Sequence, residues 1–227
     1  MRYSVNFEIE LKKNTSSGLY IALEGIDGCG KTTQLERLSE YFKSKGREVV
    51  ITREPRKSGI IGDVVHQVLL GEVKLPSVSL QYLFSADRAA NHQELVLPSL
   101  KEGKVVITDR CFWSAIVYGI LDRTAGKYDK NDADLLLMTQ SILSMYHQFT
   151  VPDFTFYLTI PLEESWKRLN TKSDTKEIYE DKEKIAKVLT GYEYLKDRFS
   201  SEITEINGNQ PIEKVTEDIV KIISQKK

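Results

Sequence analysis

A glycine-rich segment between an apolar run and an amphipathic helix pattern constrains the fold of this chain most strongly. Residues 25–32 fit the pattern G-x-x-x-x-G-K-[ST]. Residues 19–23 before it have the length and apolarity of a buried strand. Residues 33–45 after it have helical periodicity, which ends at Gly46. Glycines let such a loop curl so that successive backbone N–H groups point at phosphate oxygens. The segment therefore predicts a phosphate-binding loop in a strand–loop–helix unit.

The rest of the chain continues the alternation of strand and helix patterns. Such alternation favours a parallel sheet covered by helices on both faces, so we predict a three-layer α/β/α fold. Ligands bind to these sheets beyond the carboxyl ends of the strands. The predicted strands are 19–23, 48–52, 104–108, 154–158 and 202–207, and the predicted helices are 33–45, 60–70, 79–101 with an interruption near Pro98, 111–121, 131–148, 162–169, 182–200 and 212–224.

Two segments lie outside this alternation. Residues 1–17 combine alternating apolar residues with a polar turn, which indicates an extra strand or a tail, and we treat them as an N-terminal extension. Residues 170–181 are polar and charged without an apolar period, which suits a mobile lid. Residues 18–227 form one predicted domain, because that length suits a single larger α/β domain.

The composition excludes several classes of function. Lys and Arg total 32 against 33 Asp and Glu, and a net charge of -1 gives no general electrostatic reason to bind nucleic acid or a membrane. The two cysteines, Cys29 and Cys111, make neither a disulfide framework nor a zinc pattern. The N-terminal residues lack the apolar core of a signal peptide, and no apolar run approaches about 20 residues. We predict a cytoplasmic protein without nucleic-acid or membrane partners.

The phosphate loop assigns chemistry to individual side chains. Lys31 would bring a positive charge to the β and γ phosphates of a nucleoside triphosphate, and Thr32 would offer its hydroxyl to Mg²⁺. Asp109 ends an apolar strand, which suits either a carboxylate acting on Mg²⁺ through water or a helix cap. Beside a phosphate loop we favour the metal role. We predict that the triphosphate is bound by Gly25, Ile26, Asp27, Gly28, Cys29, Gly30, Lys31, Thr32 and Thr33.

The loop alone does not distinguish a GTPase, a motor ATPase and a small-molecule kinase. The chain contains no N-K-x-D, the segment with which a GTPase would read its base. A large ATPase would usually bring more chain and a basic or oligomeric partner surface. A kinase for a phosphorylated acceptor needs a second anion site and a lid that excludes water. Arg53, Arg88 and Arg110, at or near strand ends, and residues 170–181 offer both features.

From residue 18 onward the chain resembles the thymidylate kinases. The order and spacing of its motifs carry the resemblance. It implies a P-loop kinase fold, a homodimer, and transfer of a phosphoryl group from ATP with Mg²⁺ to dTMP for dTTP synthesis. The apolar helical faces over 79–97 and 111–121 are candidates for the dimer contact, with a core face as the alternative, because periodicity does not distinguish the two. The motifs lie at residues 24–34, 52–55, 83–88, 109–110 with Ser114 and Tyr118, 152–153 and 207–211.

The resemblance also implies roles for single residues. Asp27 would meet the acceptor's 3′-hydroxyl, and a loop cap is the alternative. Arg53 would lie between the donor and acceptor phosphates and offset their repulsion, and a surface arginine is the alternative. Phe84 would stack on thymine, although its pattern alone favours a core residue. The remaining implied contacts are Arg88 to the base, Arg110 to the acceptor phosphate, Tyr118 beneath the sugar C2′, Ser114 as a weaker contact and Asn207 near the donor adenine.

Several positions depart from the family's pattern. Some thymidylate kinases carry a basic residue after the loop aspartate, where this chain has Gly28, so the lid would supply the catalytic cation. The glutamine often found after Tyr118 is Gly119 here. Because departures touch the acceptor pocket, a kinase of the same fold for another deoxynucleoside monophosphate stays an alternative, as does a non-catalytic nucleotide-binding regulator. The candidate lid cations are Arg168, Lys172 and Lys176, the lysines with a solvated loop as their alternative.

Overall fold

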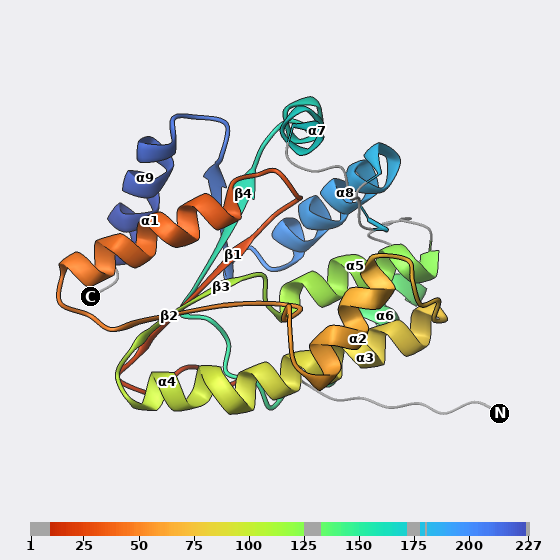
Figure 1. Cartoon of the computed structure of the whole chain (residues 1–227), viewed down its shortest axis with the longest axis horizontal. Coiled ribbons are helices and arrows are strands. Elements are labelled where there is room, and N and C mark those ends of the chain that lie inside the picture. Colours follow the sequence, from red (N-terminus) through yellow and green to blue (C-terminus); the bar gives the residue numbers. More distant parts are fainter. Residues whose placement is uncertain (1–9, 125–132, 172–177, 180, 226–227) are drawn as a thin grey trace.

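Parallel strands form the centre of the molecule (Figure 1). The computed structural model describes residues 10–124, 133–171, 178–179 and 181–225. Within them, β1 (Leu19–Glu24) pairs with both β3 (Val105–Asp109) and β4 (Phe154–Thr159). β2 (Val49–Arg53) and β5 (Ile203–Asn207) lie at the two edges. The order β2-β3-β1-β4-β5, with every pairing parallel, confirms the predicted sheet.

Helices cover both faces of this sheet and complete the three layers (Figure 1). On one face α1 (Lys31–Ser44) packs beside α9 (Ile212–Gln225). On the other face lie α4 (Leu97–Lys101), α5 (Phe112–Thr124) and α8 (Lys182–Arg198), which confirms the predicted α/β/α architecture. None of the described helices is long and apolar enough to cross a membrane. The others are α2 (Ile60–Leu69), α3 (Ser77–Asn91), α6 (Ala133–Ser144) and α7 (Leu162–Asn170).

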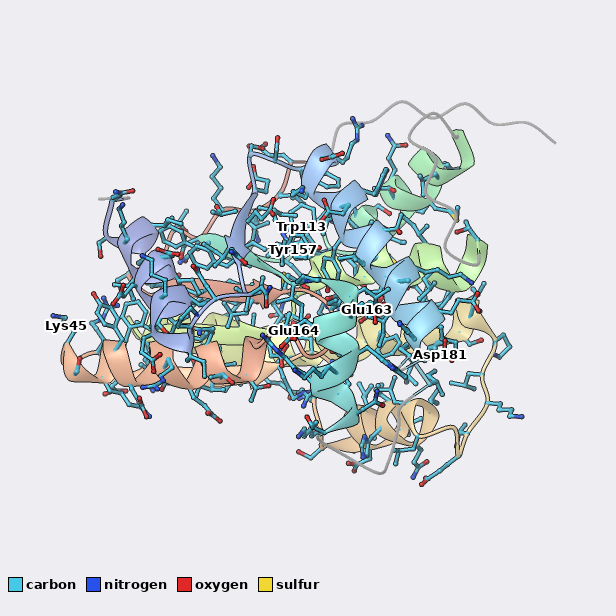
Figure 2. The ribbon with its side chains drawn as sticks, turned by 90° about the horizontal axis from the view of Figure 1, so that it is seen from above. Lys45, Trp113, Tyr157, Glu163, Glu164 and Asp181 are labelled. Carbon is cyan, nitrogen blue, oxygen red and sulfur yellow. The ribbon has the colours of Figure 1, made fainter. Side chains whose placement is uncertain are left out.

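The central strands are apolar because both faces of the sheet are covered. Ile21, Ala22 and Leu23 of β1 are fully buried. Trp113 of α5 and Tyr157 of β4 are buried as well, and Figure 2 shows both in the interior. A packed sheet of this kind fixes the positions of its strand ends and of the loops that follow them. Gly25–Gly30 and Arg110 lie in such loops, and Arg53 and Asp109 are the last residues of their strands.

The long helix predicted over 79–101 changes its hydrogen bonding before its end. α3 continues into a π-helix over His92–Val96 and then into α4, so the interruption predicted near Pro98 lies just before that proline. Pro98 has no N–H to donate, and a widened turn before it avoids the regular bond that a proline would break. The π-helix places His92 in the core, where its ring stacks on Phe149 with centroids 4.6 Å apart.

The burial of His92 makes the stability of the fold depend on pH. Burial, and to a smaller extent the positive charge of Lys12, lowers the pKa of His92 to about 4. Its Nε2 accepts a hydrogen bond from the backbone N–H of Thr150 at 2.9 Å, which requires the neutral ring. In the unfolded chain a histidine binds a proton below about pH 6.5, so stability falls as the pH drops from about 6.5 to about 4, by at most about 3 kcal/mol.

We therefore expect His92→Gln to remove the part of the loss of stability at low pH that comes from protonation of this one histidine. Urea unfolding at pH 7, 6, 5 and 4 gives the free energy of unfolding, which should decrease less steeply with falling pH in the variant than in the wild type. The exposed His147 supplies the control, since His147→Gln should keep the wild-type profile. Equal profiles for His92→Gln and the wild type would show that His92 does not carry the effect.

The predicted N-terminal extension is described from residue 10 onward. Lys12 forms an isolated parallel bridge with Thr150, and the Asn14 amide donates to Asp153 Oδ2 at 2.8 Å. The same carboxylate accepts from the backbone N–H of Tyr20 at 2.8 Å. These contacts attach residues 12–14 beside the start of β1 and β4, while the alternating apolar residues Val5, Phe7 and Ile9 lie outside the described part of the chain.

Candidate functional site

The predicted phosphate loop joins β1 to α1 at the carboxyl edge of the sheet. Gly25, Gly28 and Gly30 have φ angles of 138°, 79° and 103°, values that favour glycine. α1 begins at Lys31, slightly earlier than predicted, and the Gln34 N–H donates to Gly30 O at 3.0 Å as its first turn closes. The loop thus places backbone N–H groups and the positive end of a helix together, as an anion site requires.

Gly28 is held against α7, which explains why it carries no basic side chain. A Cβ atom added there would lie 2.9 Å from the carbonyl oxygen of Ser165. Ser165 Oγ donates to Asp27 O at 2.7 Å, and Arg168 donates to Gly28 O at 3.3 Å while it is paired with Glu164. Figure 2 shows Glu163 and Glu164 along α7. The backbone of the loop and α7 are therefore in direct contact, and a side chain at 28 would separate them.

We expect Gly28→Ala to destabilise the fold and to weaken ATP binding, because it combines a strained φ with a clash against Ser165. Gly46→Ala is the matched control. Gly46 also has a positive φ, 74°, but nothing lies within 4 Å of an added Cβ. The control should lose about 1–2 kcal/mol of stability and keep its ATP affinity. Chemical unfolding and calorimetric ATP titration measure both, and equal behaviour of the two variants would contradict the role of the α7 contact.

The lysine of the loop is buried, and its ammonium contacts the backbone and the aspartate of the loop. Lys31 is 6% exposed, and its Nζ donates to Gly25 O at 3.0 Å and to Ile26 O at 3.2 Å. The Asp27 carboxylate lies 3.5 Å from the same nitrogen. Thr32, the next residue, is exposed at the start of α1. The ammonium therefore lies within the ring of the loop, and the Thr32 hydroxyl is accessible to a ligand.

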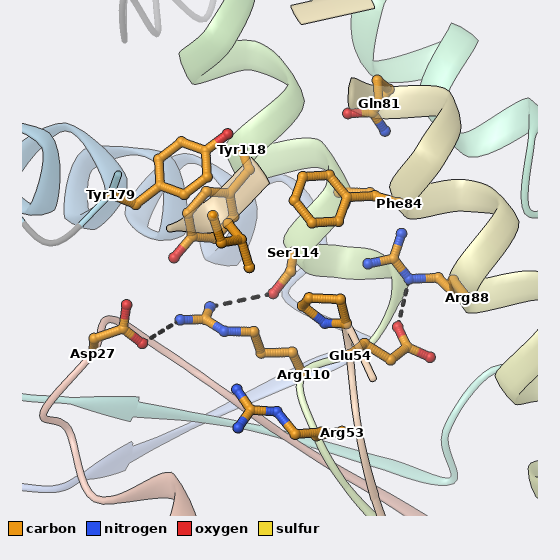
Figure 3. Close-up of a pocket in the computed structure, with 13 residues that line it drawn as sticks. Asp27, Arg53, Glu54, Gln81, Phe84, Arg88, Arg110, Ser114, Tyr118 and Tyr179 are labelled. Atoms are coloured by element: carbon orange, nitrogen blue, oxygen red, sulfur yellow. Dashed lines mark hydrogen bonds and ion pairs between the residues drawn. The ribbon is translucent and has the colours of Figure 1, made fainter. Parts of the chain in front are cut away.

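A second site, a pocket, opens beside the phosphate loop (Figure 3). It encloses about 780 Å³, solvent at its mouth included, which is within the range of small-molecule sites. The structure brings all the predicted acceptor residues to its wall, although they come from different segments of the chain. The lining residues are Asp27, Arg53, Glu54, Pro55, Leu69, Gln81, Phe84, Arg88, Arg110, Ser114, Ala115, Tyr118 and Tyr179.

Asp27 and Arg110 form an ion pair where the loop meets the pocket. Arg110 donates to Asp27 Oδ1 at 2.5 Å and to the Tyr192 hydroxyl at 2.8 Å. Burial raises the pKa of Asp27, but Arg110 and Lys31 outweigh it and lower that pKa to about 2. Asp27 is therefore an anion at neutral pH. Arg110 itself has a φ of 71°, unusual for a residue with a side chain, and its N–H donates to Leu23 O at 2.9 Å.

A buried carboxylate behind this pair holds the surrounding hydroxyls. Glu24 is fully buried at the end of β1 and accepts from Ser114 Oγ at 2.7 Å, from the Tyr192 hydroxyl at 2.8 Å and from the Cys111 N–H at 2.9 Å. Ser114 and Tyr192 in turn contact Arg110, at 3.5 Å and 2.8 Å. This network orients the Arg110 guanidinium toward Asp27, which gives Glu24 a positioning role that the sequence reading did not assign.

The other end of the pocket is formed by α3. Phe84 is half-buried and faces the cavity, so the core position favoured by its pattern is wrong. Arg88, one turn later, is 4% exposed; it donates to Glu54 and to the Tyr146 hydroxyl at 2.8 Å. These two partners fix a guanidinium beside an aromatic ring, an arrangement that suits a flat heteroaromatic ligand.

Two polar side chains at adjacent strand ends each have a buried atom without a partner among the described residues. Arg53 and Asp109 lie side by side in the β2–β3 register. Among the described residues, nothing hydrogen-bonds to Arg53 Nε or to Asp109 Oδ1, although both atoms are buried. Buried polar atoms are normally paired, so the pair points to ligands that arrive from outside the chain. Arg53 also lines the pocket, which disfavours the alternative of a surface arginine.

Two tyrosines close the side of the pocket opposite Phe84. The Tyr118 ring lies 5.1 Å from the Arg110 guanidinium and meets the Tyr179 ring edge-on with centroids 5.0 Å apart. Tyr179 comes from the predicted lid segment and donates its hydroxyl to Asp122 at 2.8 Å. The predicted lid segment therefore contributes Tyr179 to the pocket wall, while the predicted cations Lys172 and Lys176 lie outside the described residues.

The late loop predicted near the donor base packs against the phosphate loop. A Cβ atom added at Gly208 would lie 3.1 Å from Cys29 O and 3.2 Å from Thr159 O. Asn207 is exposed at the end of β5, and its Oδ1 accepts from the Asn209 N–H at 2.9 Å. Asn207 and Arg168 thus flank the phosphate loop from β5 and from α7, next to the residues predicted to bind the triphosphate.

Several site residues were missed in the sequence reading. Glu24 and Glu54 lie at strand ends next to motif residues, and this position could have marked them as site residues. Gln81 is one helical turn before Phe84, a weaker signal. Tyr146 and Tyr192 are distant in sequence from the residues that they contact, and no local pattern marks them.

Known proteins similar to this chain share one description. The family model described as "Thymidylate kinase" matches residues 23–219. The chain is 35% identical over 211 residues to a "Probable thymidylate kinase" of Pyrococcus horikoshii, covering 91% of this chain and 96% of that one. It is 34% identical over 209 residues to a "Thymidylate kinase" of Thermoanaerobacter sp. (strain X514), covering 92% and 98%, and 33% identical over 213 residues to a "Probable thymidylate kinase" of Thermococcus onnurineus, covering 90% and 97%.

Proposed function

The chain belongs to the thymidylate kinase family, and on this premise we propose that it transfers the γ-phosphoryl group of ATP to dTMP, giving dTDP and ADP, a step toward dTTP. One observation carries the proposal from the family to this chain. The pocket beside the phosphate loop contains every residue predicted to hold the acceptor, and Asp27 belongs to both sites. A donor in the loop and an acceptor in the pocket would meet at their phosphates.

The pocket suits a deoxynucleoside monophosphate along its length. At the α3 end, Phe84 offers a ring for stacking and Arg88 offers donors to a base. In the middle, the Tyr118 ring would exclude a ribose 2′-hydroxyl by its bulk. At the loop end, Asp27 would accept a hydrogen bond from the 3′-hydroxyl, while Arg53 and Arg110 would hold the acceptor phosphate. Ser114 would be a weaker contact beside Arg110.

The chain also fits Mg²⁺ bound together with ATP. The described residues contain no group of three or more acidic, histidine or cysteine side chains that could hold a metal alone. This agrees with Mg²⁺, which in such sites is bound by few protein groups, by water and by substrate phosphates. The exposed hydroxyl of Thr32 would be a direct ligand, and the unpartnered Asp109 Oδ1 would act through water. When bound, Mg²⁺ would neutralise charge on the β and γ phosphates.

The residues do their work by placing charge rather than by moving protons. The acceptor phosphate is mostly ionised at pH 7, so its oxygen can attack the γ-phosphorus in line without a general base. Lys31 would stabilise the β and γ phosphates, and Arg53 and Arg110 would offset the repulsion between donor and acceptor. Since the pKa of Asp27 is about 2, its carboxylate accepts hydrogen bonds and does not donate a proton.

The lid would complete the positive charge around the transferred group. Gly28 contributes none, and its contact with α7 leaves no room for a side chain. Arg168 already contacts the loop backbone at Gly28 O and is the candidate on α7. Lys172 and Lys176 follow it in the lid segment and are proposed as further catalytic cations.

A coupled assay for ADP release against a panel of nucleoside monophosphates tests the proposal. We expect turnover with dTMP, weaker turnover with dUMP, and little with dCMP, dAMP, dGMP or the ribonucleotide UMP. If only another deoxynucleotide is turned over, that nucleotide and not dTMP is the acceptor. Binding of both ATP and dTMP by calorimetry without ADP release would instead favour the non-catalytic regulator.

We also propose a homodimer through the outer faces of α2 and α3. Val78 and Tyr82 of α3 are 52% and 62% exposed, and Ile60 and Val64 of α2 are 91% and 39% exposed. The predicted contact over 111–121 is wrong, because the apolar face of α5 lies in the core against α3, α6 and α8. In sedimentation experiments we expect the wild type to be a dimer and Tyr82→Glu to be a monomer. A monomeric wild type would contradict the proposal.

A further inference from the structure

Gln81 is a buried polar residue in the wall of the acceptor pocket. It lies on α3, one turn before Phe84 and two turns before Arg88, so the three side chains share one face of the helix. Figure 3 shows them in this order along α3. Gln81 is 4% exposed, and it lines the same cavity as Phe84 and Arg88. Glutamine is rarely buried so completely without a hydrogen-bonding reason.

The side-chain amide of Gln81 occupies the space next to Gly119. A Cβ atom added at Gly119 would lie 2.7 Å from Gln81 Oε1 and 3.3 Å from its Cδ. The two residues come from different helices, α3 and α5, which pack against each other. A larger residue at 119 would displace the amide, so the glycine on α5 is what admits the glutamine from α3.

The amide nitrogen of Gln81 is the polar atom of this residue that a ligand could satisfy. Nε2 is buried, and within the described part of the chain no atom accepts a hydrogen bond from it. A buried donor without an acceptor destabilises a protein. Because the residue lines the pocket, a ligand with an acceptor at that point would satisfy the donor.

We propose that Gln81 is a specificity-determining residue that donates from Nε2 to a ring carbonyl of the acceptor base; this rests on the proposed function. The Arg88 guanidinium on the same face of α3 can only donate as well. Two donors require acceptors on the base edge, which a 2,4-dioxopyrimidine such as thymine or uracil offers. The Gln81 donor would face C4, where thymine has a carbonyl oxygen and cytosine an amino group, itself a donor, so it disfavours cytosine. The amide thus reaches the base from α3, in the space left by Gly119 on α5.

Two variants whose side chains are about as long as glutamine test this role. Gln81→Met fills the same space without a polar group, and Gln81→Glu replaces the donor with acceptors. We expect Gln81→Met to lower kcat/KM for dTMP by about 10- to 100-fold. Gln81→Glu should lower the ratio of kcat/KM for dTMP to that for dCMP by about tenfold or more, because a carboxylate repels a carbonyl and accepts from an amino group.

Controls separate this proposal from the folding and from the proposed function. Gln140→Met, at an exposed position of α6, should keep wild-type kinetics. ATP affinity should be unchanged in both Gln81 variants, which verifies that the phosphate loop is folded. Unchanged kcat/KM for dTMP in Gln81→Met, or an unchanged dTMP to dCMP ratio in Gln81→Glu, would overturn the role of Gln81. Absence of dTMP turnover in the wild-type protein would instead contradict the proposed function itself.

Discussion

Replacing Arg53 with Met is expected to lower kcat for phosphoryl transfer to dTMP by about 100- to 1,000-fold, the usual effect of removing one preorganised donor from an active site. Arg53 lies in the pocket wall, and its buried Nε has no partner among the described residues. No described residue accepts from this Nε, so an anion from outside the chain would give it a partner. Its loss would leave the repulsion between donor and acceptor phosphates uncompensated.

The stability of the Arg53→Met variant should move in the opposite direction from its activity. The free energy of unfolding should not fall, because the buried Nε of Arg53 has no acceptor among the described residues whose hydrogen bond could be lost. The assay measures kcat and KM for dTMP together with urea unfolding. Arg37→Met is the control, since Arg37 lies on the exposed side of α1 and pairs at 3.1 Å with Glu213. If Arg53→Met keeps the wild-type kcat, Arg53 has no role in phosphoryl transfer.

Replacing Lys31 with Met is expected to reduce kcat by at least about 1,000-fold, since the charge on the β and γ phosphates would lose its fixed counterpart. The Lys31 ammonium lies within the loop, 3.0 Å from Gly25 O and 3.2 Å from Ile26 O. Met keeps most of the apolar bulk of the side chain and removes the charge together with the hydrogen bonds to Gly25 O and Ile26 O.

Single-turnover measurement at saturating ATP separates the chemical step from binding. Lys43→Met, in the last turn of the same helix, is the control and should retain wild-type rates. In Lys31→Met the pKa of Asp27 should also rise, because one of the two cations that lower it is gone, and NMR titration of the carboxyl would detect this. A Lys31→Met enzyme with a normal single-turnover rate would contradict the proposed phosphate role.

The sequence by itself was sufficient for the elements whose signals are local. The phosphate loop follows from its spacing of glycines and its lysine, and the parallel sheet follows from apolar runs that alternate with helical periods. Every predicted strand is present within one or two residues. Arg53 and Arg110 were marked by their places at strand ends, whereas Phe84 was assigned through the family resemblance, because its own pattern favoured a core residue. Such patterns depend on neighbours in the chain, which a linear reading can see.

Only the tertiary structure decided how these residues are supported. Glu24 holds Tyr192, and Gln81 rests against Gly119, although each pair joins different elements of the fold. Gly28 is uncharged because Ser165 of a distant helix leaves it no space. Periodicity reports which face of a helix is apolar but not which partner covers it. The partners are set by packing between distant segments, where a few tenths of an ångström decide what fits, and that information is not local to any stretch of sequence.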